Sequence, residues 1–398
     1  MNKTHIIPFI LIVLICFLTG CWSRKEINQI SIASAIGIDK SEQGYLVTAQ
    51  LINPGEISPK SISTRTAITT YSASGETIFE AIRRLSLKTP RKTYLAHIRL
   101  LVFGEDFAKD GIGKALDFFF RDPEIRTDFY IMVTRGSTAE ELLHILTPLE
   151  KIPADKMFFS LEISSKAWAP TKTVQLDELI SNLISEGKNP TLTGILIKGD
   201  PEIGMDIKNV EKVNAPTTIE ISNIAVFKKD KLVGWLNESE SKGLNYIEGN
   251  VSNTVFSIPC SEEEKLTVEL LRTKVKVKGK VENGEPKIDI MLWVEANVGE
   301  VGCEIDLSNP DNIYILEEKV AQEIKNIMKM SVKKVQKDFK SDIFGFGEAI
   351  HRADPNAWKQ LKEDWDKEFE ELEVTINVTA KIRRVGEITK SFQKEVRD

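Results

Sequence analysis

Cys21 is the residue whose type and surroundings predict chemistry most clearly. It follows Leu18-Thr19-Gly20 and closes a run of 13 largely apolar residues that begins at Ile6. A helical membrane span needs roughly 20 such residues, so this run is too short and has the proportions of a secretory signal peptide. The small residues before the cysteine match the bacterial lipobox, in which the thiol is lipidated and becomes the first mature residue. We predict that residues 1–20 are removed and that Cys21 anchors the chain; the alternative is a signal peptide that merely ends near a cysteine.

The other cysteines agree with export. Cys16 leaves with the signal peptide, so Cys260 and Cys303 are the remaining pair in the mature body. They could form a disulfide in an oxidising compartment, but two buried free thiols are equally ordinary. Spacing alone does not establish pairing, and both alternatives stay open.

A search for catalytic or metal-binding groups finds no suitable constellation. His97, His144 and His351 have neither HExxH nor paired His/Cys spacing, so a zinc site is not predicted. The GIGK letters of residues 111–114 suggest a phosphate loop, but Ala108 replaces its first glycine and the Ser/Thr after the lysine is missing. No GxSxG nucleophile motif occurs. We predict no catalytic residue, no metal and no cofactor, and therefore no enzyme.

Charged residues also gather without defining a site. The carboxylates of residues 363–373 are typical of a solvated helical face. Along a predicted strand, Lys274, Lys276, Lys278 and Lys280 alternate with small or apolar residues. A solvated face that resists aggregation is the commoner explanation, and docking on anionic lipid is the alternative.

The composition is that of a globular chain. Hydrophobic residues make up 41% and charged residues 28%, with a net charge of −6. This mild acidity gives no support for nucleic-acid binding, which usually requires a basic surface. Because one hydrophobic core stops growing near ~250–300 residues, a chain of 398 residues predicts two or more domains.

The first half of the mature chain alternates between β-rich and helical segments, without strict βαβ regularity. An α+β domain is therefore predicted over residues 21–198. The expected strands are 31–39, 44–53, 63–75, 94–104, 126–136 and 190–199. The expected helices are 77–88, 106–120 with a break at its glycines, 138–146, 154–168 and 174–185.

Residues 199–218 are the predicted linker, because they hold two prolines and two glycines and few large apolar groups. A second α+β domain is expected over residues 219–390, with 219–258 as a candidate for a small separate subdomain. Asn283-Gly284 predicts a hairpin between long strands. The whole is a multi-domain α+β fold with mixed or antiparallel sheets and packed helices.

The C-terminal part is expected to contain one long helix over about residues 311–340, because apolar residues recur at three- and four-residue spacing. A tail strand over 372–386 is expected to return to the sheet. The block of residues 342–366 is predicted to be a structural clasp. Trp358 and Trp365 in it should share one helical face, which indicates core first and an interface second.

Four blocks of the sequence carry a family resemblance. They are residues 20–40, with GCW-x-RKEIN and AIGIDK, then 93–112, 223–249 and 342–366. Their content and order resemble the Ger(x)C lipoproteins, the C subunits of spore nutrient germinant receptors. Residues 199–218 carry no such likeness.

The resemblance implies a lipoprotein without established catalytic activity, attached through Cys21 to the outer face of the inner spore membrane. It also implies membrane A and B subunits as partners, and leaves direct nutrient binding open. The alternative class is a lipid-anchored solute-binding protein or envelope hydrolase, which needs a cleft with convergent polar groups. A deep, polar-lined pocket between domains would favour this alternative, and shallow surfaces would favour a scaffold.

Overall fold

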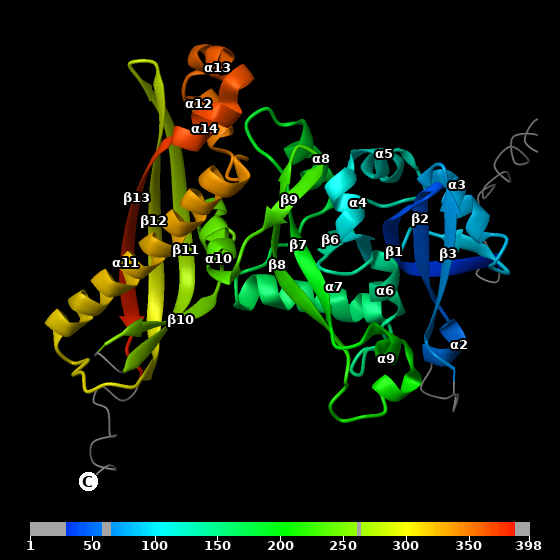
Figure 1. The fold of residues 1–398 in the computed structure, drawn as a ribbon. Coiled ribbons are helices and arrows are strands. Elements are labelled where there is room, and N and C mark those ends of the chain that lie inside the picture. Colours follow the sequence, from blue (N-terminus) through cyan, green and yellow to red (C-terminus); the bar gives the residue numbers. More distant parts are fainter. Residues whose placement is uncertain (1–28, 58–64, 261–263, 387–398) are drawn as a thin grey trace, which may run out of the picture.

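The computed structural model describes residues 29–57, 65–260 and 264–386, which form two sheets with packed helices (Figure 1). The sheets lie towards opposite ends of the molecule, and α10 (Glu238–Glu248) lies between them. Both sheets mix parallel and antiparallel pairs. The predicted α+β class is therefore confirmed.

The first sheet has nine strands within the described residues, in the order β3-β2-β1-β5-β6-β7-β8-β9, with β4 paired to β1. The centre from β1 through β5 and β6 to β7 is parallel, and the outer strands are antiparallel. The strands are β1 (Ile30–Ser41), β2 (Gly44–Ile52), β3 (Ile68–Gly75), β4 (Lys92–Tyr94), β5 (Leu100–Phe103), β6 (Tyr130–Thr134), β7 (Thr191–Lys198), β8 (Thr218–Lys228) and β9 (Lys231–Trp235).

Helices cover both faces of this sheet, as parallel strands require. β5 shows the arrangement, because Leu101 and Phe103 point into one core and Leu100 and Val102 into the other. The first core is covered by α3 (Ile78–Leu85), α4 (Glu105–Asp110), α5 (Gly113–Arg121) and α8 (Leu176–Ile184). The second is covered by α6 (Ala139–His144) and α7 (Pro153–Ala167). The short α2 (Pro54–Ile57) follows β2.

The second sheet has the order β10-β11-β12-β13 in the part of the chain described here. The predicted Asn283-Gly284 turn joins β11 to β12, with φ of 55° and 87°, and is confirmed. Helices α10, α11, α12, α13 and α14 share one core with this sheet. The new elements are β10 (Thr254–Pro259), β11 (Lys265–Glu282), β12 (Glu285–Val301), β13 (Glu373–Arg384), α11 (Pro310–Lys334), α12 (Phe346–Ala353), α13 (Pro355–Leu361) and α14 (Trp365–Glu371).

The predicted long helix is confirmed, but its last turn differs from an α-helix. α11 spans 25 residues and continues as a π-helical turn, Val335–Phe339. Lys340 then ends it in the left-handed conformation, with φ of 49°. Asn309 caps its N-terminus by accepting from the backbone N–H of Asp311.

Two predicted strands are clearly wrong in extent, and the first is 126–136, of which β6 occupies only Tyr130–Thr134. Residues 94–104 are not a single strand, because β4 ends at Tyr94 and β5 begins at Leu100. The turn between them still buries Leu95 and Ile98, which are each 6% exposed. The continuous apolar pattern came from this burial of the turn.

Residues 199–218, the predicted linker, connect β7 to β8, which pair with each other in the first sheet. They contain α9 (Pro201–Met205) and a 3-10 turn, Ile207–Asn209. The Asn209 amide is buried and donates to the carbonyls of Leu146 at 3.1 Å and Thr217 at 3.0 Å. Residues 219–258 contribute β8 and β9 to one sheet and β10 to the other. Where the domains divide stays a prediction.

Of the two alternatives for Cys260 and Cys303, the structure shows the disulfide. Cys260 follows β10 and Cys303 follows β12, and their sulfur atoms are bonded. The bond closes a loop between residues 43 positions apart.

Candidate functional site

The part of the molecule built on the first sheet and the part built on the second sheet meet where residues 185–190 contact residues 341–348. We call this contact the seam. The Asn189 N–H donates to the Asp342 carbonyl at 2.6 Å. A Cβ on Gly187 would lie 2.5 Å from the backbone nitrogen of Glu348, so a larger residue would force the seam apart. Gly187 accepts a bond from that same nitrogen. The contact is therefore backbone against backbone.

The Asp342 carboxylate organises the start of the predicted clasp. It accepts the backbone N–H groups of residues 344–347 at 2.8 to 3.2 Å and the indole N–H of Trp365 at 3.0 Å. Burial raises the pKa of Asp342 to about 6, although these hydrogen bonds act in the opposite direction. One side chain thus joins the turn to α14.

The two tryptophans of the clasp belong to the core, as predicted, but they do not share one helical face, because Trp358 lies on α13 and Trp365 begins α14 after a 3-10 turn, Lys362–Asp364. Trp358 is 2% exposed and Trp365 is 4% exposed. Their rings pack edge to face with centroids 5.1 Å apart. Gly345 has φ of 75°, so the tight turn before them uses the conformation that glycine tolerates best.

A buried ion cluster forms a second connection across the molecule. Glu248 ends α10 and accepts from the Lys172 ammonium at 2.9 Å and from the Lys188 ammonium at 2.8 Å. The three side chains are 6%, 4% and 17% exposed. Burial alone would raise the pKa of Glu248, but the two lysines hold it below its ordinary value. Gly249 follows in the left-handed conformation and ends the helix.

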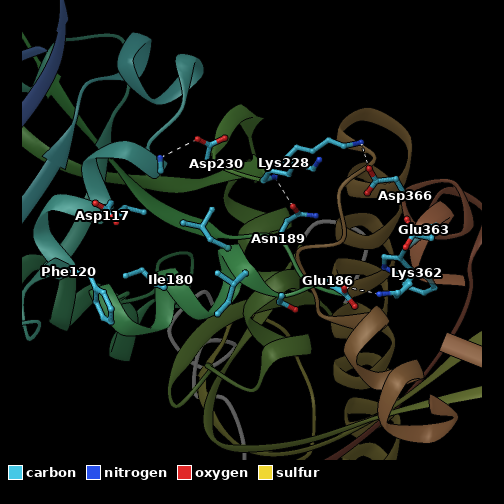
Figure 2. Close-up of a pocket in the computed structure, with 17 residues that line it drawn as sticks. Asp117, Phe120, Ile180, Glu186, Asn189, Lys228, Asp230, Lys362, Glu363 and Asp366 are labelled. Atoms are coloured by element: carbon cyan, nitrogen blue, oxygen red, sulfur yellow. Dashed lines mark hydrogen bonds and ion pairs between the residues drawn. The ribbon is translucent and has the colours of Figure 1, made fainter. Parts of the chain in front are cut away.

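A cavity of about 710 Å³ opens beside the seam (Figure 2). Its first wall comes from α5, α8 and the β8–β9 turn, and its second wall comes from residues 362–366. Ion pairs join the walls, with Lys228 to Asp366 at 2.9 Å and Lys362 to Glu186 at 3.0 Å. The cavity therefore lies between the two parts of the molecule and presents charge from both.

The cavity combines paired charges with exposed apolar groups. Phe120 is 61% exposed and Ile184 is 77% exposed, and both line it. Asp230 is turned towards α5, where it accepts the Gly113 N–H at 3.2 Å. Such a lining suits contact with a mixed polar and apolar surface, or with a small polar solute.

The three histidines of the predicted mature chain do not converge on one site. His97 lies beside Tyr94, with rings 5.7 Å apart, and His351 stacks on Trp358 at 5.9 Å. His144 bonds to the Glu140 carbonyl in its own helix. In the described ranges, no group of three or more His, Cys, Asp or Glu side chains could hold a metal ion.

Cys21, the predicted lipid attachment site, lies outside the described residues. Among the helices that the structure describes, none is long and apolar enough to cross a membrane. Four lysines of β11 were predicted to lie on a solvated strand face. Lys274, Lys276 and Lys278 are exposed, whereas Lys280 is half-buried and pairs with Asp289.

Sequence reasoning missed the Glu248 cluster. Its lysines are 76 and 60 residues from the carboxylate, and neither distance has a periodic signal. Gly249 marks a helix end, but it says nothing of which cations meet there. The clasp could be predicted because its glycines and tryptophans lie close together in the sequence.

Comparisons with known proteins match both parts of the chain. The family model "Spore germination protein N-terminal domain" matches residues 23–197, and "Spore germination B3/ GerAC like, C-terminal" matches residues 222–386. Spore germination protein KC of Bacillus subtilis (strain 168) is 29% identical over 395 residues, covering 97% of each chain. Spore germination protein B3 of that organism is 25% identical over 397 residues, covering 96% of this chain and 98% of that protein.

The solved crystal structure of the GerBC protein has the same fold. The match has a TM-score of 0.54 at 20% identity and covers 90% of this chain and 99% of that one. Fold and matches define an α+β protein of the spore germination class. The chain belongs to the Ger(x)C family, the C subunits of germinant receptors.

Proposed function

We propose that this chain is a non-catalytic, lipid-anchored subunit of a nutrient germinant receptor. It would support nutrient-triggered germination through contacts with the membrane A and B subunits. The observation that carries the proposal is family membership across both parts of the chain, residues 23–197 and 222–386. The two relatives named above are spore germination proteins, and their alignments with this chain cover nearly their whole lengths.

The proposed anchor is a diacylglycerol on the Cys21 sulfur. One acyl chain holds a protein only reversibly, whereas two make a stable tether. The tether would hold the body on the outer face of the inner spore membrane and raise its effective concentration near membrane partners. The lipobox residues Leu18-Thr19-Gly20 support this assignment.

We expect Cys21→Ala to abolish lipid labelling and to release the chain from the spore membrane fraction, with the fold unchanged. Germination by nutrients through this receptor should fall sharply, while agents that bypass receptors should act normally. Cys16→Ala is the matched control, because it lies in the predicted leader and should change neither readout. A Cys21→Ala chain that stays in the membrane and responds normally would refute the anchor.

The partner contacts can be tested by co-purification. Solubilised spore membranes carrying an affinity tag on this chain should yield the A and B subunits in constant ratio. The same body, incubated with esters, peptides, glycans and phosphates, should give background rates only. Reproducible hydrolysis that is lost on changing one cavity residue would show an enzyme instead.

A second candidate is direct binding of a small polar solute in the seam cavity. Its volume of about 710 Å³ falls in the ~300–1,000 Å³ range of ligand sites, and its lining brings Lys229 and Glu363 to one space. Titration with amino acids, sugars and nucleosides separates the candidates. Saturable binding that Lys229→Ala removes and Lys88→Ala preserves would favour the solute site.

A further inference from the structure

The outer surface of α3 and the loop behind it combine exposed apolar and basic side chains. We call Phe79, Arg83, Leu87, Arg91 and Lys92 the α3 face. All five are exposed, with Phe79 at 47% and Leu87 at 85%. The Arg83 guanidinium lies 4.8 Å from the centre of the Phe79 ring. Isolated exposed apolar residues are common, but here they are surrounded by cations.

The charge of this face contrasts with that of the whole chain, which is −6. Within the described ranges, Arg83 and Arg91 have no carboxylate partner. Arg84 and Lys88 add two flanking cations. The acidic groups nearby are Glu80, paired with Arg84 at 2.7 Å, Glu124, paired with Lys92 at 2.9 Å, and Asp122 and Glu76, of which Glu76 lies just before α3. Five cations therefore stand against four carboxylates, and the surface has a small local excess of positive charge.

The α3 face also lies beside the start of the described chain. Gln29 lines the same groove, of about 760 Å³, as Phe79, Arg83 and Arg91. The next residue, Ile30, pairs with Lys92. Cys21 lies eight positions before Gln29 in the sequence. A fully extended segment of eight residues spans at most about 26–29 Å. A lipid on Cys21 would keep this face close to the bilayer.

We propose that the α3 face docks directly on an anionic membrane surface. Phe79 and Leu87 enter the headgroup boundary, while Arg83 and Arg91, which have no carboxylate partner in the described ranges, meet lipid phosphates. The proposal rests on the lipid anchor of the proposed function and gives the tethered body an orientation. In Figure 1, α3 and the second sheet lie at opposite ends of the molecule, so docking leaves the second sheet and the seam free for protein partners.

Two other exposed surfaces are less suited to contact an anionic membrane. Residues 200–213 expose Ile203 and Ile207, each 44% accessible, near Leu149, which is 95% exposed. That segment carries four carboxylates and only two lysines, so it does not complement anionic lipid. The exposed lysines of β11 lie on the second sheet, away from the tethered end.

The first experiment places one fluorophore on each surface of the lipidated chain. Leu87→Cys and Leu149→Cys are labelled and reconstituted in vesicles of phosphatidylglycerol and phosphatidylcholine, with or without brominated acyl chains. The bromolipid should quench the label at position 87 severalfold more than the label at 149. The difference should disappear in phosphatidylcholine alone. Equal quenching, or stronger quenching at 149, overturns the proposal.

The second experiment uses the mature chain, residues 21–398, with Cys21→Ser, so that no lipid attaches. Arg83→Glu with Arg91→Glu should lower binding to anionic vesicles by about tenfold or more. Lys274→Glu with Lys278→Glu makes the same charge change on β11 and should alter binding by less than about twofold. Both double variants change exposed side chains and should unfold at the wild-type temperature. A larger loss from the β11 variant would assign docking to that strand and overturn the proposal.

The two experiments separate the docking surface from the anchor. If Cys21 carries no lipid, the wild-type chain will not float with phosphatidylcholine vesicles. The charge variants still report on the α3 face in that case, because their binding to anionic vesicles is compared in chains that carry no lipid on residue 21. If the chain floats but neither label is quenched, the anchor holds and the docking surface is refuted.

Discussion

Two buried carboxylates join the parts of this molecule, and they are stabilised by different groups. Glu248 meets the ammonium groups of Lys172 and Lys188, at 2.9 and 2.8 Å. Asp342 instead meets five N–H groups, four from the backbone and one from Trp365, none of which carries a formal charge. Burial penalises both carboxylates in the same way.

The outcome of that penalty differs. Two cations at hydrogen-bonding distance outweigh burial and leave the pKa of Glu248 below its ordinary value. Five dipoles do not outweigh it, and the pKa of Asp342 stands at about 6. In a low-dielectric site, opposite charges thus shift the ionisation equilibrium more than neutral donors do. Glu248 should be a permanent ion pair, and Asp342 a group that titrates.

The largest effect is expected from Glu248→Ala. This change leaves Lys172 and Lys188 buried without their main partner and should lower the free energy of unfolding by roughly 3–5 kcal/mol. Urea unfolding gives the value. Glu220→Ala is the control, because its pair with Lys198 is exposed and should contribute at most about 1 kcal/mol. Equal losses in both variants would mean that burial adds nothing to the cluster.

The second effect is a pH dependence with opposite signs in the two groups. The pKa of Asp342 rises from 3.8 to about 6, so the folded state holds this proton more tightly than the unfolded state. Its contribution to stability is complete below about pH 4 and is lost as pH rises through about 6, by up to about 3 kcal/mol. Glu248 contributes above its ordinary pKa of 4.5, and that contribution is lost as pH falls through its lowered value.

Asp39 has a pKa of about 6 as well, so a difference measurement is needed to isolate Asp342. The free energy of unfolding of wild type minus that of Asp342→Asn should be largest near pH 4 and should decline towards pH 7. A difference that grows with pH would show that the five donors outweigh burial after all.

A third, smaller effect tests the hydrogen bond from Trp365. Trp365→Phe keeps an aromatic ring but removes the donor at 3.0 Å from Asp342. It should destabilise the protein by roughly 1.5–3 kcal/mol more than Trp358→Phe, since a hydrogen bond to a charged group is worth about that much. Both tryptophans are buried, so the loss of ring volume is matched. Thermal unfolding at pH 7 compares them, and equal losses would rule out a special role for the indole N–H.

The smallest effect is expected at the rim of the cavity. Lys362 and Glu186 pair at 3.0 Å, but their side chains are 31% and 61% exposed. A double-mutant cycle with alanine at both positions should give a coupling of about 0.2–1 kcal/mol. A coupling above about 2 kcal/mol would make this pair, rather than the buried cluster, a principal connection of the seam.

Local features of the fold could be predicted from the sequence because their determinants are local. The Asn283-Gly284 turn needs two residues that tolerate positive φ, and the helix predicted over 138–146 is observed as α6, which begins directly after its N-cap, Thr138. The burial of Trp358 was predicted from its spacing with Trp365, although the structure places the two residues on separate helices, α13 and α14. The lipobox at Cys21 is likewise a local pattern, and its lipidation stays a prediction.

The tertiary structure decided what depends on distant parts of the chain. It paired Cys260 with Cys303, joined β7 to β8 across the predicted linker, and brought Lys172 and Lys188 to Glu248. A lysine 76 residues from a carboxylate carries no sequence signal for that contact, because the packing of two sheets, and not periodicity, sets the distance between them. Side-chain types and spacings determine helices, turns and caps, whereas the seam, its cavity and its two unlike carboxylates exist only once the sheets have met.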